Sequence, residues 1–288
     1  MMMDLAEQSP RGHVCSHTLH VGRCCRGSFG NLKSMKAYLP RTAAFAWAPS
    51  NAEVSGPVMA TGTVAGALDE SFNNDSVLEL WHLNASADDT MNLSPTVASS
   101  VNANGRFNRL GWGFAHKDKP YGLLAAGLEN GEVGVWDVGL MLDPHTTAQS
   151  QVLRNSMHKG SVRGLSFNQP QPNLIATGSV NAEIYVWDLK APNKPYTPGS
   201  RSQHLDEISS LAWNGQVPYV LATASTNGCT TVWDLRHKRE IAVLRNNSAP
   251  AAAAMSSARS ISALAWHPLS PTRIATATED DMNPGIVL

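Results

Sequence analysis

Histidines and cysteines near the start of the chain are the residues best suited to metal chemistry. Zinc sites of small folds combine Cys-x₂₋₄-Cys with His-x₃₋₅-His, because two short turns must bring four ligands to one tetrahedron. The N-terminal side chains do not follow this spacing, so we predict no metal site. The residues concerned are His13, Cys15, His17, His20, Cys24 and Cys25.

Catalytic signatures do not occur in the sequence either. There is no G-x-S-x-G nucleophile elbow, G-x-x-x-x-G-K-[ST] phosphate loop, H-E-x-x-H metal helix or G-x-G-x-x-G dinucleotide turn. Two charged runs, Glu279-Asp280-Asp281 and His116-Lys117-Asp118-Lys119, are typical of solvated turns. We therefore predict no catalytic residues, no cofactor-binding residues and no cofactor, and we expect that the chain is not an enzyme.

Tryptophans, in contrast, recur at regular intervals. Four of them close successive segments at spacings of 55, 51 and 46 residues, and the last three are each followed by aspartate. The other four each end an apolar run at the start of a segment, and Phe167 takes that place in the third. The closing set is Trp81, Trp136, Trp187 and Trp233, and the opening set is Trp47, Trp112, Trp213 and Trp266. A period in the forties and fifties that ends in Trp-Asp is typical of WD-repeat β-propellers, in which each repeat supplies about four strands.

The third repeat shows the expected order of strands most clearly. Residues 162–167 alternate apolar and polar side chains, as a strand with one buried face does. Residues 174–178 form a short apolar run, which is typical of a strand covered on both faces. The second and fourth repeats have the same order around Asn130-Gly131 and Asn227-Gly228 turns, and Asn-Gly between apolar runs is a strong hairpin signal.

Five repeats can be counted, and the fifth is incomplete. It opens well at 261–266 and 274–278, but the sequence ends at Leu288 before a closing tryptophan. We predict an all-β fold, an incomplete WD-repeat β-propeller of four blades and a partial fifth, where seven blades is the usual number. Residues 1–34 match no repeat, so we expect a disordered leader over 1–34 and the propeller over 35–288.

The Trp-Asp pairs are predicted to be structural. A buried indole fills the space between neighbouring blades, and its N–H needs a partner. In WD-repeat proteins a loop histidine and a turn aspartate take part in that network. Here only His158 fits the loop position, and Asn130, Asn181 and Asn227 occupy the turns. We therefore expect incomplete networks.

Composition and charge limit the partners of the chain. The formal net charge is −1, so no overall field attracts nucleic acid or an anionic membrane. No run of 18 apolar residues occurs, so membrane association would be peripheral. Three of the four cysteines lie in the first 25 residues and Cys229 is far from them, which is not a disulfide framework. Protein partners are the expectation.

Several stretches resemble one family, the large WD-repeat subunit of the outer COPII coat (the Sec-thirty-one family). The most specific is an insertion in the first repeat, residues 64–76, which generic WD repeats lack. The resemblance covers about residues 35–288. The other matching stretches are 41–43, 45–47, 60–63, 78–79, 127–131, 158–160, 162–165, 183–189, 206–209, 213–214, 231–236, 264–268 and 279–281.

This resemblance implies a structural subunit that scaffolds vesicle formation in transport from the endoplasmic reticulum to the Golgi. It implies self-assembly into a coat, and contacts with the smaller WD-repeat outer-coat subunit and with the inner coat and its small GTPase, through regions absent from this chain. The implied location is cytoplasmic, peripheral on endoplasmic reticulum exit sites and COPII vesicles. The alternative is an unrelated WD-repeat adaptor, for instance of a ubiquitin ligase or chromatin complex, and the 64–76 insertion discriminates between the two.

Overall fold

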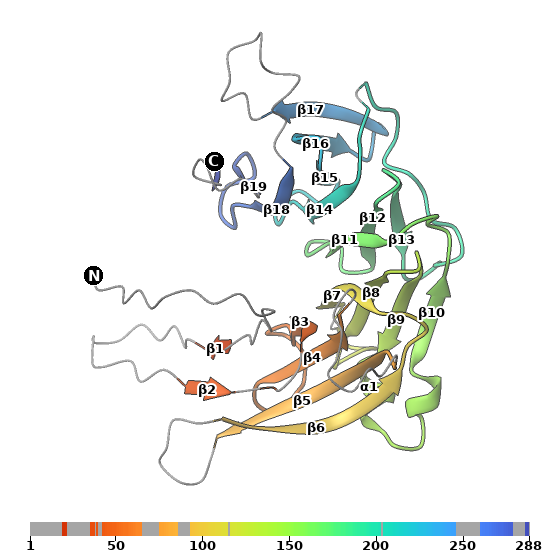
Figure 1. Ribbon diagram of the computed structural model, residues 1–288, viewed down its shortest axis with the longest axis vertical. Helices are drawn as coiled ribbons and strands as arrows, with labels where there is room; N and C mark the ends of the chain where they lie inside the picture. The colour runs from red at the N-terminus through yellow and green to blue at the C-terminus, as the bar shows by residue number, and fades with distance from the viewer. Residues whose placement is uncertain are drawn as a thin grey trace, which may run out of the picture.

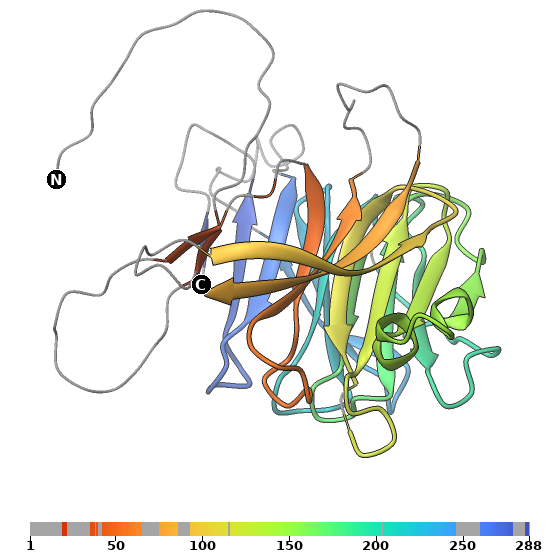
Figure 2. The same ribbon diagram turned by 90° about the horizontal axis from the view of Figure 1, so that it is seen from below.

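Five antiparallel sheets follow one another around an arc in the computed structural model (Figure 1). Seen from a direction at right angles, the sheets stand side by side like the blades of a propeller (Figure 2). Their sequence order is their order around the arc, and the arc does not close, which confirms the predicted incomplete all-β propeller. The residues described are 19–21, 35–37, 39, 42–64, 75–85, 93–114, 116–202, 204–245, 260–278 and 286–287.

Blades 1 and 2 have four strands each, ordered as in the sequence. Blade 1 consists of β3 (Ala43–Trp47), β4 (Val58–Thr63), β5 (Val77–Ala85) and β6 (Leu93–Asn102). Blade 2 consists of β7 (Phe107–Gly113), β8 (Leu123–Leu128), β9 (Val133–Asp137) and β10 (Gln151–Asn155). The link from β9 to β10 contains α1 (Val138–Leu142) and the 3₁₀ turn η1 (Thr147–Gln149), which the sequence did not predict.

Blades 3, 4 and 5 confirm the remaining repeat boundaries. Blade 3 consists of β11 (Val162–Phe167), β12 (Leu174–Ser179) and β13 (Ile184–Asp188). Blade 4 consists of β14 (Ile208–Trp213), β15 (Val220–Ser225), β16 (Cys229–Asp234) and β17 (Arg239–Arg245). The partial blade 5 consists of β18 (Ile261–Trp266), β19 (Ile274–Thr278) and β20 (Ile286–Val287).

Blade 3 differs from the expectation of four strands in each of the first four blades. Its fourth strand is reduced to one bridge, in which Val186 and Tyr196 exchange backbone hydrogen bonds of 2.8 and 3.0 Å. Pro192, Pro195 and Pro198 explain the difference, because proline has no N–H to donate to a ladder. The four-strand prediction is therefore wrong for blade 3.

The N-terminal region also differs from expectation at one place. A two-stranded sheet pairs β1 (Leu19–Val21) with β2 (Met35–Ala37), so the prediction that 1–34 lacks regular structure is wrong over β1. The rest of 1–34 lies outside the described residues, as do the 279–281 acidic run and most of the 64–76 insertion. The division between leader and propeller at residue 35 remains a prediction.

The core lies between the blades. The first strands of successive blades lie against one another, β3 with β7, β7 with β11, β11 with β14 and β14 with β18. At the interface of blades 3 and 4, the fully buried Ile208 packs over Gly178, where a Cβ would lie only 2.4 Å from Ile208 Cγ2. Glycine is therefore required at this position to let the two sheets approach.

Gly178→Ala is expected to destabilise the fold by about 1–3 kcal/mol, the usual range for overpacking a buried site. The added methyl would have to displace Ile208 or separate the two blades. Gly215→Ala is the matched control, since a Cβ there would make an ordinary contact of 3.5 Å with Gln169. Equal urea midpoints for the two variants would show that the blades do not pack as described.

No helix of the described residues is long and apolar enough to cross a membrane.

Candidate functional site

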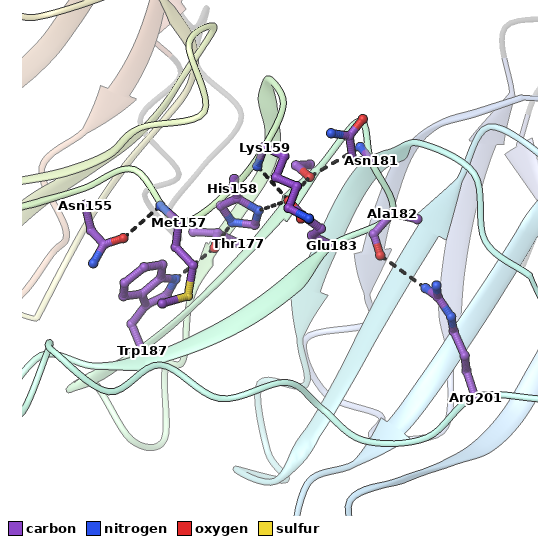
Figure 3. A network of polar contacts seen from close by, with 11 residues as sticks. Asn155, Met157, His158, Lys159, Thr177, Asn181, Ala182, Glu183, Trp187 and Arg201 are labelled. Carbon is purple, nitrogen blue, oxygen red and sulfur yellow. Dashed lines mark hydrogen bonds and ion pairs between the residues drawn. The ribbon is translucent and has the colours of Figure 1, made fainter.

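A buried polar network joins three elements of blade 3 (Figure 3). Trp187 on β13 donates its indole N–H to the Thr177 hydroxyl on β12 over 2.8 Å. His158, in the loop before β11, places Nε2 at 2.8 Å from the same hydroxyl. All three side chains are nearly inaccessible to water. The predicted loop histidine and closing tryptophan are therefore brought together, and a threonine links them.

Glu183 completes the network at its outer side. Its carboxylate accepts hydrogen bonds from the Lys159 backbone N–H at 2.9 Å and from the Ser179 hydroxyl at 3.3 Å. The same carboxylate oxygen lies 3.5 Å from His158 Nδ1 (Figure 3). The acidic side chain thus fixes the start of the histidine loop to the turn between β12 and β13.

Burial determines the protonation state of His158. Desolvation lowers its pKa from 6.5 to about 4, and the Glu183 carboxylate opposes this change only in part. The neutral tautomer with its proton on Nδ1 fits these positions: Thr177 donates to Nε2, and Nδ1–H faces the Glu183 carboxylate 3.5 Å away. His158 is therefore a neutral structural residue near pH 7.

Folding stability is expected to decline as the pH falls from about 6.5 to about 4, by roughly 1 kcal/mol per pH unit. In this interval the unfolded histidine binds a proton that the folded one does not, so acid favours the unfolded state. Above pH 6.5 both states are neutral, and the contribution no longer changes. Urea unfolding of the wild-type chain and of His158→Asn between pH 4 and 8 measures it. The variant should show a shallower pH dependence, and identical slopes would contradict the assignment.

The indole–threonine hydrogen bond recurs in other blades. Trp81 donates to Thr61 over 2.8 Å in blade 1, and Trp233 donates to Thr223 over 3.0 Å in blade 4. Blade 2 lacks this bond, because Ala126 occupies the threonine position. The sequence interpretation overlooked the threonines, although Ala-Thr-Gly or Ala-Thr-Ala marks the second strand of blades 1, 3, 4 and 5.

The aspartate of each Trp-Asp pair ends the third strand of its blade. Asp137, Asp188 and Asp234 each accept a 2.9 Å hydrogen bond from the backbone N–H two residues further on. This Asx geometry turns the chain out of the sheet. Hydrogen bonds from Arg236, and secondarily from His237, hold the pKa of Asp234 well below its usual range. The prediction that these pairs are structural agrees with their contacts.

Two of the opening tryptophans connect neighbouring blades, whereas Trp112 donates its indole N–H to the Tyr121 carbonyl of its own blade over 2.9 Å. Trp213 in blade 4 donates its indole N–H to the Ser166 carbonyl of blade 3 over 3.2 Å. Trp266 in blade 5 donates to the Ala212 carbonyl of blade 4 over 3.0 Å. The bonds of Trp213 and Trp266 run from a later blade to the one before it, so these two indoles help to hold blades 3, 4 and 5 together.

The charged turn of blade 2 lies at the surface as predicted, with Lys117 and Asp118 exposed between paired His116 and Lys119. Lys119 also forms an ion pair with the buried Asp137, a contact that sequence spacing did not indicate. Among the described residues, no three His, Cys, Asp or Glu side chains are grouped to hold a metal. The statement that the chain has no catalytic or cofactor-binding residues stays a prediction.

Comparison with known proteins agrees with this architecture. The family model described as "WD domain, G-beta repeat" matches residues 149–188, which contain the network of blade 3. Fold and network together define a WD-repeat β-propeller.

Within that class the chain is of the SEC31 type. It is 52% identical over 268 residues to "Protein transport protein SEC31" of Mycosarcoma maydis, covering 88% of this chain and 19% of that protein. The Candida albicans protein of the same name is 39% identical over 249 residues, covering 86% of this chain and 18% of the relative. The chain thus spans about a fifth of the length of the curated relatives it matches, and the predicted family is confirmed.

Solved structures give the same result. A chain of "COPII on membranes, outer coat vertex" is 33% identical with a TM-score of 0.68, and the match covers 85% of this chain and 60% of that one. A chain of "The structure of the COPII coat assembled on membranes" has the same identity and TM-score and is covered to 33%.

Proposed function

We propose that this chain is a structural subunit of the COPII outer coat that scaffolds vesicle formation in transport from the endoplasmic reticulum to the Golgi. The observation that carries the proposal is the 52% identity to a SEC31 protein over 88% of the chain. The similarity to a chain of the outer coat vertex supports it independently from structure. The role is one of assembly, and we propose that the chain is not an enzyme.

The geometry supports a rigid platform. The indole, threonine and histidine groups of blade 3 are buried and hydrogen-bonded to one another, so they hold the blade together and leave its surface free for partners. We propose that the partners are proteins: further copies within the coat, and, through regions of the longer relatives that this chain does not cover, the smaller WD-repeat outer-coat subunit and the inner coat with its small GTPase. The proposed location is cytoplasmic, peripheral on endoplasmic reticulum exit sites and COPII vesicles.

A replacement experiment in Mycosarcoma maydis tests the proposal. The segment of its SEC31 that aligns with this chain is exchanged for residues 35–288, and growth and the position of a fluorescent tag are recorded. Growth with puncta at exit sites is expected. The control exchanges the same segment for an unrelated WD-repeat domain, which should not support growth.

Diffuse fluorescence together with loss of growth would overturn the coat assignment. In that case the alternative, an unrelated WD-repeat adaptor of a ubiquitin ligase or chromatin complex, would be favoured.

A further inference from the structure

The proline-rich segment 190–201 takes the place of the missing fourth strand of blade 3. Besides its central bridge to β13, it is held at both ends. Near its start the Ala191 N–H donates to the Asp188 carbonyl over 2.9 Å, and at its end Arg201 Nη1 donates to the Ala182 carbonyl over 3.1 Å. These contacts fix the segment along the outer edge of β13, so its outward side chains have a defined position.

Burial along this segment repeats every third residue, as in an extended polyproline-type conformation. The prolines form the inward side: Pro192 and Pro195 are half-buried and Pro198 is buried. The outward side consists of exposed small, hydroxyl and cationic residues. Its members are Ala191, Lys194, Thr197 and Ser200. The prolines are therefore engaged with the propeller, and the segment presents a polar stripe to solvent.

A turn of blade 4 lies beside this stripe. Residues 235–239 connect β16 to β17, and the Ser200 N–H donates to the Lys238 carbonyl over 3.2 Å. Ser200 also forms a parallel bridge with Arg239. Within the turn Arg236 is fixed, because its guanidinium bonds Asp234 and lies 3.4 Å from the Tyr219 ring centroid. Two segments some forty residues apart in the sequence thus form one surface.

The two segments carry five exposed cations, which we name the basic rim: Lys190, Lys194, Arg201, Lys238 and Arg239. No acidic residue occurs in 189–202 or 235–239. None of the five side-chain charges forms an ion pair with a carboxylate of the described residues, whereas Lys119, Arg154, Arg163 and Arg236 each do. The chain as a whole carries a net charge of −1, so the positive charge here is local.

We propose that the basic rim binds an extended acidic peptide segment of a protein partner. The cations follow two neighbouring segments of chain, and the exposed hydroxyls of Thr197 and Ser200 lie among them as hydrogen-bond donors for carboxylates. Because both segments are held by backbone hydrogen bonds, little backbone conformational entropy is lost on binding. Complementary charge speeds association and selects the partner, and the contact weakens as salt is added.

The test uses the full 288-residue chain and a fluorescein-labelled peptide of ten glutamates, with a glutamine peptide of equal length as the neutral probe. Binding is followed by fluorescence anisotropy at several salt concentrations. The rim variant carries Lys190→Glu, Lys194→Glu, Lys238→Glu and Arg239→Glu. The matched control carries Arg109→Glu, Lys117→Glu, Lys159→Glu and Arg273→Glu, four exposed cations outside the rim.

Both variants change the formal net charge from −1 to −9, because each of the four reversals removes one positive charge and adds one negative charge. The rim variant should bind the glutamate peptide at least tenfold more weakly than the wild-type chain, and the control should lose less than threefold. Unchanged thermal midpoints establish that both variants are folded.

If both variants lose the same affinity for the glutamate peptide, overall charge explains the loss and the proposal is overturned. It is also overturned if the rim variant binds the peptide as tightly as the wild-type chain. Vesicles containing phosphatidylserine and a single-stranded oligonucleotide are assayed in parallel. Tighter rim-dependent binding of either probe than of the peptide would replace the acidic peptide with that class of partner.

Discussion

Trp187→Ala is expected to lower the free energy of unfolding by about 3–5 kcal/mol, the range for truncating a buried large aromatic side chain. The indole is fully buried and belongs to the apolar cluster that contains Val162, Leu165 and Ile175. Its removal leaves a cavity between blades 2 and 3 and takes the hydrogen bond from Thr177. Urea denaturation followed by circular dichroism measures the change.

Trp266→Ala is the control for this prediction, because Trp266 is only partly buried although its indole N–H is also bonded. Trp266→Ala should lower the free energy of unfolding by clearly less than Trp187→Ala does. If the two variants unfold at the same urea concentration, the closing indole is not the more deeply packed one.

Thr177→Val is expected to cost roughly 2–6 kcal/mol, although it conserves shape and removes only one hydroxyl. That hydroxyl serves both Trp187 Nε1 and His158 Nε2, and leaving a buried polar group unpaired costs about 1–3 kcal/mol for each group. The free energy of unfolding from urea titration is the quantity to compare.

Thr223→Val in blade 4 provides the matched comparison, since Thr223 receives the Trp233 indole and no histidine. It should cost about half as much. A Thr223 variant as unstable as the Thr177 variant would show that His158 contributes nothing through the shared hydroxyl.

The sequence predicted the blades because their signals are local. Asn-Gly turns, alternating apolar residues and the closing tryptophans each act within one repeat, and β12 and β16 lie where those signals placed them. Pro192, Pro195 and Pro198 prevent a full fourth strand in blade 3. These prolines are also a local signal, but the regular repeat led to a prediction of four strands there. The helix α1 is a different case. Val138–Leu142 carries no periodic pattern long enough to indicate a helix, and the Asp137 side chain caps it.

The candidate site was predictable only in part. His158 and Trp187 could be named from their places in the repeat, but Thr177 links them because antiparallel pairing sets it opposite Tyr185, two residues before the tryptophan. That relation depends on register, which composition does not give. The basic rim was harder still to predict, because Ser200 and Lys238 lie 38 residues apart in the sequence and only the fold brings them within hydrogen-bond distance.

The hydrogen bonds from Trp213 and Trp266 to the preceding blades have a mechanical consequence. Trp266 fastens blade 5 to blade 4 and Trp213 fastens blade 4 to blade 3, and none of the five blade sheets extends into a neighbouring blade. The stability of such an array is close to a sum of terms from each unit and each interface between neighbours. A load applied to the end of blade 5 would therefore detach blade 5 first and then blade 4. The force–extension curve would show one rupture per blade, each lengthening the chain by a repeat.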